Sequence, residues 1–206
     1  MSCPNHLEAC LVFGPRPVTV ENMEKSFFRR WFGSAAPSPV PETTEALAER
    51  GVAEAQFKLG LKYANGIGTA QNYPQAEHWY LKAADQNHVL AQFNLGMMHA
   101  QGQGMPQNDL KSQEWFQKAA NLGDAGGQYR IGIIHQRAIR DGLPENASRS
   151  RIDAFQWLRL AADQGYYGAE EVCIMVNLQM TREDVAEGRR RVAVFKEEGD
   201  RHVQPA

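Results

Sequence analysis

AQFKLGLKYANGIG, residues 55–68, and AQFNLGMMHAQGQG, residues 91–104, are nearly the same sequence within one chain of 206 residues. Each copy reads as a helix with a glycine in its middle and ends in two further glycines, which tolerate the positive φ that stops helices. Repetition at a fixed period of about 20 to 50 residues is the sequence signature of repeat architectures. The pair of segments therefore predicts a helical repeat protein.

Other columns of the sequence repeat at the same period. Gln56, Gln92 and Gln128 are spaced by 36 and 36 residues. The further repeated positions are Gly60, Gly96 and Gly132, then Trp79, Trp115 and Trp157, and the alanine pairs at 83–84, 119–120 and 161–162. The last interval between tryptophans is 42 residues, which predicts a six-residue insertion between Gly132 and Trp157, within AIRDGLPENASRS.

Each unit is predicted to hold two helices. The second helix of each unit is expected to start at Asn72, Asn108 and Ser150, because their side chains can accept a hydrogen bond from the first turn. Pro74 is compatible with that first turn. Apolar residues then recur at the spacing of one buried helix face.

The glycine in the middle of each first helix costs about 1 kcal/mol relative to alanine. Its recurrence at Gly60, Gly96 and Gly132 predicts close packing, in which the missing Cβ leaves room for the indole of Trp79, Trp115 or Trp157. A helix kink at each glycine is the alternative.

Both ends of the array differ from its repeats. ETTEALAERG precedes the first unit and is predicted to be a cap helix, and Ile174 replaces the glycine after the third unit. Thr181 and Asp184 resemble a capping box that opens a polar last helix. The predicted layout is a flexible leader and linker at 1–41, a solenoid at 42–199 with repeats at 52–87, 88–123 and 124–165 and a C-terminal cap at 166–199, and a tail at 200–206.

The repeated pattern resembles the Sel-one-like repeat (SLR) family, relatives of the tetratricopeptide repeats. The matching residues of the first copy are Gln56, Leu59, Gly60, Tyr63, Gly66, Gly68, Trp79, Tyr80, Lys82, Ala83 and Ala84. The third copy departs from the pattern, since it keeps only Gly142 of the loop glycines and has Leu160 for lysine. The resemblance implies an all-α protein, a right-handed α-solenoid of three helix-turn-helix repeats with N- and C-terminal cap helices, whose concave surface scaffolds other proteins.

Composition excludes several functions. The balance of 22 basic and 24 acidic residues gives a net charge of -2, which argues against nucleic acid as a partner. Three cysteines, Cys3, Cys10 and Cys173, cannot form a disulfide framework and favour a reducing compartment. No apolar run is long enough to span a membrane or to serve as a secretory signal, so we expect a cytoplasmic protein.

No catalytic or cofactor motif is present in the sequence. Cys3, His6 and Cys10 cluster, but their spacing fits no common zinc module. His99 and His135 share one repeat column, which favours a core position over a ligand pair. A hydrolase of β-lactam or cell-wall substrates, an activity attached to some relatives, would need a nucleophile–base pair that we do not find. We therefore expect a protein that is not an enzyme, with no metal and no cofactor.

A stripe along the first helices is the predicted binding surface. Its residues are Lys58, Lys62, Asn65, Asn94, Met98, Gln101, Arg130, Ile134 and Arg137. Four cations, no acid and two apolar side chains favour a partner protein or peptide carrying acidic and apolar residues, bound in the concave groove. The alternative is that these are ordinary solvated helix residues.

SFFRRWF, residues 26–32, is the other unusual segment. Its aromatic and basic side chains could seat at an anionic membrane surface, which would make the chain a membrane-associated adaptor. The simpler interpretation is a leader that folds back over the first repeat.

Overall fold

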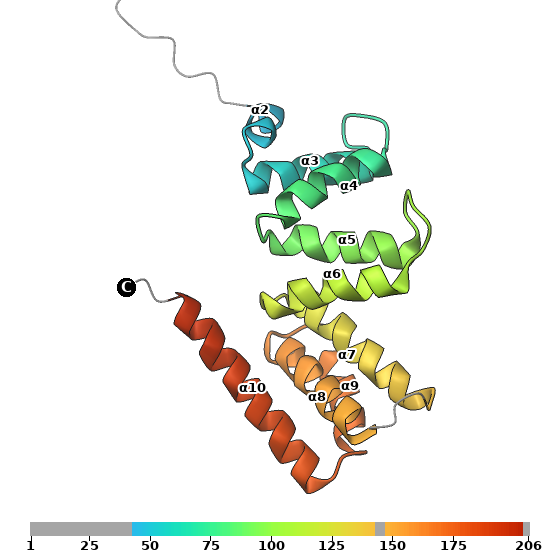
Figure 1. The fold of residues 1–206 in the computed structure, drawn as a ribbon, viewed down its shortest axis with the longest axis vertical. Helices are drawn as coiled ribbons and strands as arrows, with labels where there is room; N and C mark the ends of the chain where they lie inside the picture. The colour runs from blue at the N-terminus through green and yellow to red at the C-terminus, as the bar shows by residue number, and fades with distance from the viewer. Residues whose placement is uncertain (1–42, 143–146, 204–206) are drawn as a thin grey trace, which may run out of the picture. The chain divides into compact units, whose positions relative to one another are not determined.

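A computed structural model describes residues 43–142 and 147–203 of the chain, and these residues form nine helices and no strand. The helices are α2 (Thr44–Glu49), α3 (Ala53–Asn65), α4 (Tyr73–Ala84), α5 (Val89–Gln101), α6 (Asp109–Asn121), α7 (Ala125–Arg140), α8 (Ala147–Asp163), α9 (Ala169–Asn177) and α10 (Arg182–Val203). Figure 1 shows them stacked as successive antiparallel hairpins, with α10 lying alongside α8. The described part of the chain is therefore an all-α solenoid, as the repeat predicted.

The predicted caps form at two of three second helices. Asn72 and Asn108 each accept a hydrogen bond from the backbone N–H three residues on, at 3.0 and 2.9 Å. Ser150 is not a cap, because α8 already begins at Ala147 and contains it. Both helices of the third hairpin are longer than those of the first. α7 has 16 residues and α8 has 17, whereas α3 has 13 and α4 has 12.

Loop glycines end two of the three first helices as predicted, while the C-cap of α7 is Asp141. Gly66 and Gly102 close α3 and α5 in the left-handed region, with φ of 68° and 66°. The backbone N–H of each donates to a carbonyl four residues earlier, which satisfies one group that the helix end would leave unpaired.

The mid-helix glycines do serve close packing, but the predicted partner was wrong. A Cβ on Gly60 would lie 2.5 Å from Cδ1 of Tyr80, not against Trp79. Gly96 faces the Phe116 ring and Gly132 faces Leu158, each at 2.6 Å by the same measure. In every repeat the glycine therefore receives the residue that follows the tryptophan.

The three tryptophans lie to the side of these contacts. The Lys82 ammonium lies 4.4 Å from the centre of the Trp79 ring, and Lys118 lies 3.9 Å from that of Trp115, both as cation–π pairs. Leu160 replaces this lysine in the third repeat. There Trp157 meets Phe195 of α10 edge to face, with 5.5 Å between ring centres.

The end of the solenoid departs from the repeat. α9 follows the third hairpin as a first helix would, but Ile174 stands where the other first helices have glycine and is 50% exposed. α10 has its extensive contact with α8 instead of α9. It approaches α8 closely at Gly188, where a Cβ would lie 2.6 Å from the Phe155 ring.

The start of α10 has the predicted capping box. The Asp184 N–H donates to the Thr181 hydroxyl at 3.1 Å, and the Thr181 N–H donates to the Asp184 carboxylate at 3.4 Å. Two ion pairs then attach α10 to α8, from Arg191 to Asp153 at 2.7 Å and from Lys196 to Asp163 at 2.6 Å.

Candidate functional site

The stripe predicted on the first helices is only partly a surface. Its last positions in each helix, Asn65, Gln101 and Arg137, are exposed. Its middle positions belong to the core or its margin: Met98 is 3% exposed and packs in the cluster around Tyr80, while Ile134 is half-buried. Met98 was predicted to contact a partner but is buried, so it offers a partner little surface of its own.

The stripe contains no acid of its own, but acidic residues beside it pair with its two lysines. The Lys58 ammonium lies 3.0 Å from Glu54, one turn earlier in α3. Lys62 lies 2.6 Å from Glu45 of α2, and its hydrogen bond lowers the pKa of that carboxyl. Both lysines are exposed and already have an acidic partner, so neither offers an unmatched charge.

Two cations of the stripe remain unmatched. Arg130 and Arg137 of α7 take part in no ion pair within the described ranges. The Arg130 guanidinium lies 5.9 Å from the centre of the Phe116 ring, and its buried Nε has no hydrogen-bond partner there. Arg137 is exposed two turns later on the same face of α7. Within the stripe, the positive charge without an acidic partner therefore lies on α7.

A pocket of about 180 Å³ lies between α3 and α5 and includes part of the stripe. It brings together Asn65, Asn94 and Met98 from the prediction, and adds residues that the sequence reasoning missed: Leu61, Ala64, Gln71, Tyr73, Tyr80, Met97 and Gln103. Burial raises the pKa of the Tyr80 phenol to about 12, although a hydrogen bond with Asn94 opposes this, so the phenol stays neutral. The pocket offers amides, a hydroxyl and apolar walls.

The stripe also joins one repeat to the next. Asn94 bonds Tyr80 of the preceding repeat, and Arg130, 36 residues later, lies over Phe116 in the same column. Tyr80 and Phe116, which pack against the mid-helix glycines, thus also contact a stripe residue of the next repeat. Periodicity alone could not reveal this contact, because it depends on how successive hairpins cross.

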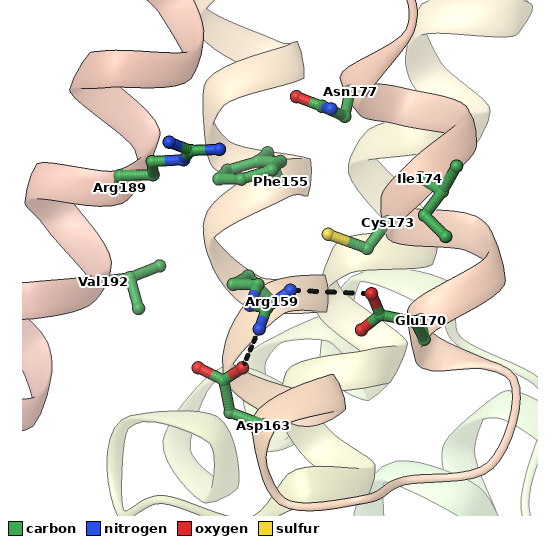
Figure 2. Close-up of a pocket in the computed structure, with 9 residues that line it drawn as sticks. All are labelled: Phe155, Arg159, Asp163, Glu170, Cys173, Ile174, Asn177, Arg189 and Val192. Carbon is green, nitrogen blue, oxygen red and sulfur yellow. Dashed lines mark ion pairs between the residues drawn. The ribbon is translucent and has the colours of Figure 1, made fainter.

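A second cleft, of about 420 Å³, lies where α8, α9 and α10 meet. Figure 2 shows Arg159 inside it, with ion pairs to Asp163 at 2.7 Å and to Glu170 at 3.5 Å. Burial raises the pKa of the Cys173 thiol to about 11, so at neutral pH it is protonated and a poor nucleophile. The charges in this cleft compensate one another.

The other candidate chemistry is placed as follows. Cys3, His6, Cys10 and residues 26–32 lie outside the described residues. Burial lowers the pKa of both His99, which is 7% exposed, and His135. Across 43–142 and 147–203, no three His, Cys, Asp or Glu side chains gather as a metal site. No helix in those ranges is long and apolar enough to cross a bilayer.

Comparison with known proteins agrees with the geometry. No curated protein matches the chain. The crystal structure of a Sel1 repeat protein from Oxalobacter formigenes is similar, with 32% identity and a TM-score of 0.54 over 63% of this chain and 93% of that one. c5321, a protective antigen of uropathogenic Escherichia coli with an SLR fold, has 20% identity and a TM-score of 0.46, and this chain covers 50% of it.

The repeats themselves identify the family. The model of the Sel1 repeat matches residues 53–88, 89–124 and 125–166, which together make up more than half of the chain. The matched segments begin at α3, α5 and α7, so each holds one hairpin of the solenoid. This chain belongs to the Sel1 repeat family.

Proposed function

We propose that the chain is a non-catalytic interaction module of the cytoplasm, which holds a segment of a partner protein across the first helices of its repeats. The proposal is supported by membership of the Sel1 repeat family, whose repeats generally bind proteins. A chain of stacked hairpins also presents a long, open surface to a partner.

One observation carries the choice of surface. Arg130 and Arg137 have no acidic partner in the described part of the chain, whereas Lys58 and Lys62 are neutralised by Glu54 and Glu45. The acidic residues of a partner segment would therefore be attracted most strongly where they lie over α7. Electrostatic complementarity of this kind favours specificity and rapid association.

The pocket between α3 and α5 extends this surface. Asn65 and Asn94 can exchange hydrogen bonds with a peptide backbone, and Met98 contributes to the floor although it is buried. Gln101 is exposed on the last turn of α5 between this pocket and α7. The best-fitting partner is an extended segment with apolar side chains toward α3 and α5 and acidic ones toward α7.

Affinity capture with matched charge variants tests the surface. The full chain, R130E/R137E and R149E/R182E are used to capture proteins from a lysate of the native host, and the bound proteins are quantified by mass spectrometry. Both variants change the net charge by the same amount, and Arg149 and Arg182 are exposed on α8 and α10. Circular dichroism checks that each variant stays helical.

We expect a set of proteins bound by the full chain and by R149E/R182E to be lost from R130E/R137E. Equal capture by the two variants would show that α7 does not hold the partner. Loss from both would point to general charge attraction instead of a specific surface.

A further inference from the structure

A buried glutamine recurs at the junction of successive hairpins. The Nε2 atoms of Gln56, Gln92 and Gln128 donate to the carbonyls of Ala48, Ala84 and Ala120, at 3.1, 3.3 and 3.4 Å. All three glutamines are at least 96% buried. Because the carbonyl fixes which amide atom is the nitrogen, each Oε1 must find a donor elsewhere.

A second glutamine supplies that donor in two of the three repeats. Gln86 Nε2 donates to Gln56 Oε1 at 2.8 Å, and Gln164 Nε2 donates to Gln128 Oε1 at 2.9 Å. The residue at the same column of the middle repeat is Leu122. Accordingly, Gln92 Oε1 is buried and has no hydrogen-bond partner in the described part of the chain.

The glutamine that carries the unpaired oxygen lines a pocket of about 410 Å³. The pocket is also lined by Leu122, Asn87, Trp115, Lys118 and the exposed Asp85. Leu122 is 47% exposed at the end of α6, so its side chain can turn into solvent and open the way to the glutamine. This site lies at the first turn of α5, the opposite end of that helix from Gln101 and the surface proposed above.

The neighbouring repeats show which chemical group fits. Besides the buried oxygen, Gln86 Nε2 donates to the Lys82 carbonyl at 3.3 Å, and Gln164 Nε2 donates to the Gly123 carbonyl at 3.0 Å. The same columns of the middle repeat hold Lys118 and Asn87, which line the pocket. Asn87 keeps the left-handed backbone of the Gly123 column, with φ of 60° against 91°. Two acceptors in this arrangement match the two hydrogens of a primary amide.

We propose that the pocket beside Gln92 binds the side-chain carboxamide of a glutamine from a partner polypeptide. The incoming NH₂ donates to Gln92 Oε1 and to the backbone carbonyl of Asn87 or Lys118. Gln86 and Gln164 make the corresponding pairs of hydrogen bonds in the other two repeats. The half-buried Trp115 ring forms an apolar wall for the methylene groups. Lys118 lies over that ring and faces the carboxamide oxygen from the pocket rim.

A small-molecule titration tests the proposal without knowledge of the partner. N-acetyl-L-glutamine methylamide is titrated into the full chain while NMR follows the Gln92 side-chain amide and the Trp115 indole. N-acetyl-L-glutamic acid methylamide is the matched control, because its side chain has the same length but ends in a carboxylate that has no hydrogen to donate at neutral pH. Lys118 would attract its negative charge and Asp85, which also lines the pocket, would repel it, so the comparison is repeated with Asp85→Asn. Rejection of the glutamate derivative that persists in this variant would be due to the unpaired acceptor and not to charge.

Three variants complete the design. Leu122→Gln supplies the donor from within the chain and should abolish the response to the glutamine derivative. Leu122→Ala widens the access to Gln92 and should preserve the response to the glutamine derivative. Leu110→Gln places the same new side chain at a 76%-exposed position at the other end of α6 and should leave binding unchanged.

We expect saturable shifts with the glutamine derivative and binding of the glutamate derivative that is weaker by roughly tenfold or more. An absence of saturable shifts, equal binding of the two derivatives, or unchanged binding by Leu122→Gln would each overturn the proposal. Because the probe meets neither Arg130 nor Arg137, the result does not depend on the surface proposed for the first helices.

Discussion

Gly96 lies so close to Phe116 that a Cβ added to the glycine would be 2.6 Å from the phenylalanine ring. The same relationship holds between Gly60 and Tyr80 and between Gly132 and Leu158. It fixes the distance between the two helices of each hairpin. Each substitution of these glycines therefore tests the packing that builds the solenoid.

Gly96→Ala should lower the free energy of unfolding by about 1–3 kcal/mol, because the ring has to move from a well-packed position. Chemical denaturation measures the loss. Gly199→Ala is the control: no atom lies within 4 Å of a Cβ there, so the alanine should stabilise α10 by up to about 1 kcal/mol. A double-mutant cycle should show strong coupling of Gly96→Ala to Phe116→Ala and none to Trp115→Ala.

Phe195→Ala should destabilise the chain by about 1–2 kcal/mol, because it removes the edge-to-face contact with Trp157 and exposes part of that ring. Tryptophan fluorescence should shift to longer wavelength. Val194→Ala, at a 38%-exposed neighbouring position, should have little effect on either measurement. If both variants behave alike, α10 does not anchor through this contact.

Leu122→Gln should raise the thermal midpoint by about 2–4 °C, the shift that about 1 kcal/mol produces in a domain of this size. The new amide would donate to Gln92 Oε1, which is otherwise buried and unpaired. Differential scanning calorimetry compares it with Leu110→Gln, which should gain nothing. A midpoint that rises equally in both variants would refute the predicted hydrogen bond.

Stability should fall as the pH drops below about 6.5, because burial lowers the folded-state pKa of His99 and His135 beneath that ordinary value. The unfolded chain then binds protons that the folded chain resists, so the stabilisation is complete above pH 6.5 and declines below it. The charges around His99 are Glu77, Lys111 and Glu114.

Urea unfolding at about pH 7.5 and about pH 5.5 measures this decline, since most carboxyl groups stay ionised in that interval. His99→Gln should reduce the difference between the two conditions. His78→Gln, which alters an exposed histidine, should not reduce it. An identical decline in both variants would rule out His99 as its source.

The sequence predicted the fold well because a repeat shows the same local pattern several times. The caps at Asn72 and Asn108 and the capping box of Thr181 and Asp184 depend on residues three positions apart, so they too could be found. The residues that pack against the mid-helix glycines could not be predicted from the sequence. Trp79 and Tyr80 are adjacent but point about 100° apart on a helix, and only the crossing of the two helices decides which one meets Gly60.

The binding stripe was less predictable for a related reason. Whether Met98 faces solvent depends on the rotation of α5 against Tyr80, and Lys62 meets Glu45 of a preceding helix. The glutamine site could have been found by the same alignment that revealed the repeat. Gln86, Leu122 and Gln164 form one column, and the leucine is its exception.

Ile174 has a consequence for the length of the array, because it replaces the glycine against which each second helix packs. A further hairpin of the same kind would need a second helix that packs a large side chain against this position, and Ile174 leaves less room there than the glycine of the repeats. An engineer who wished to add a repeat would have to replace Ile174 with glycine and release α10 from α8. Two features therefore stand in the way of a longer array: the side chain of Ile174 and the contact of α10 with α8.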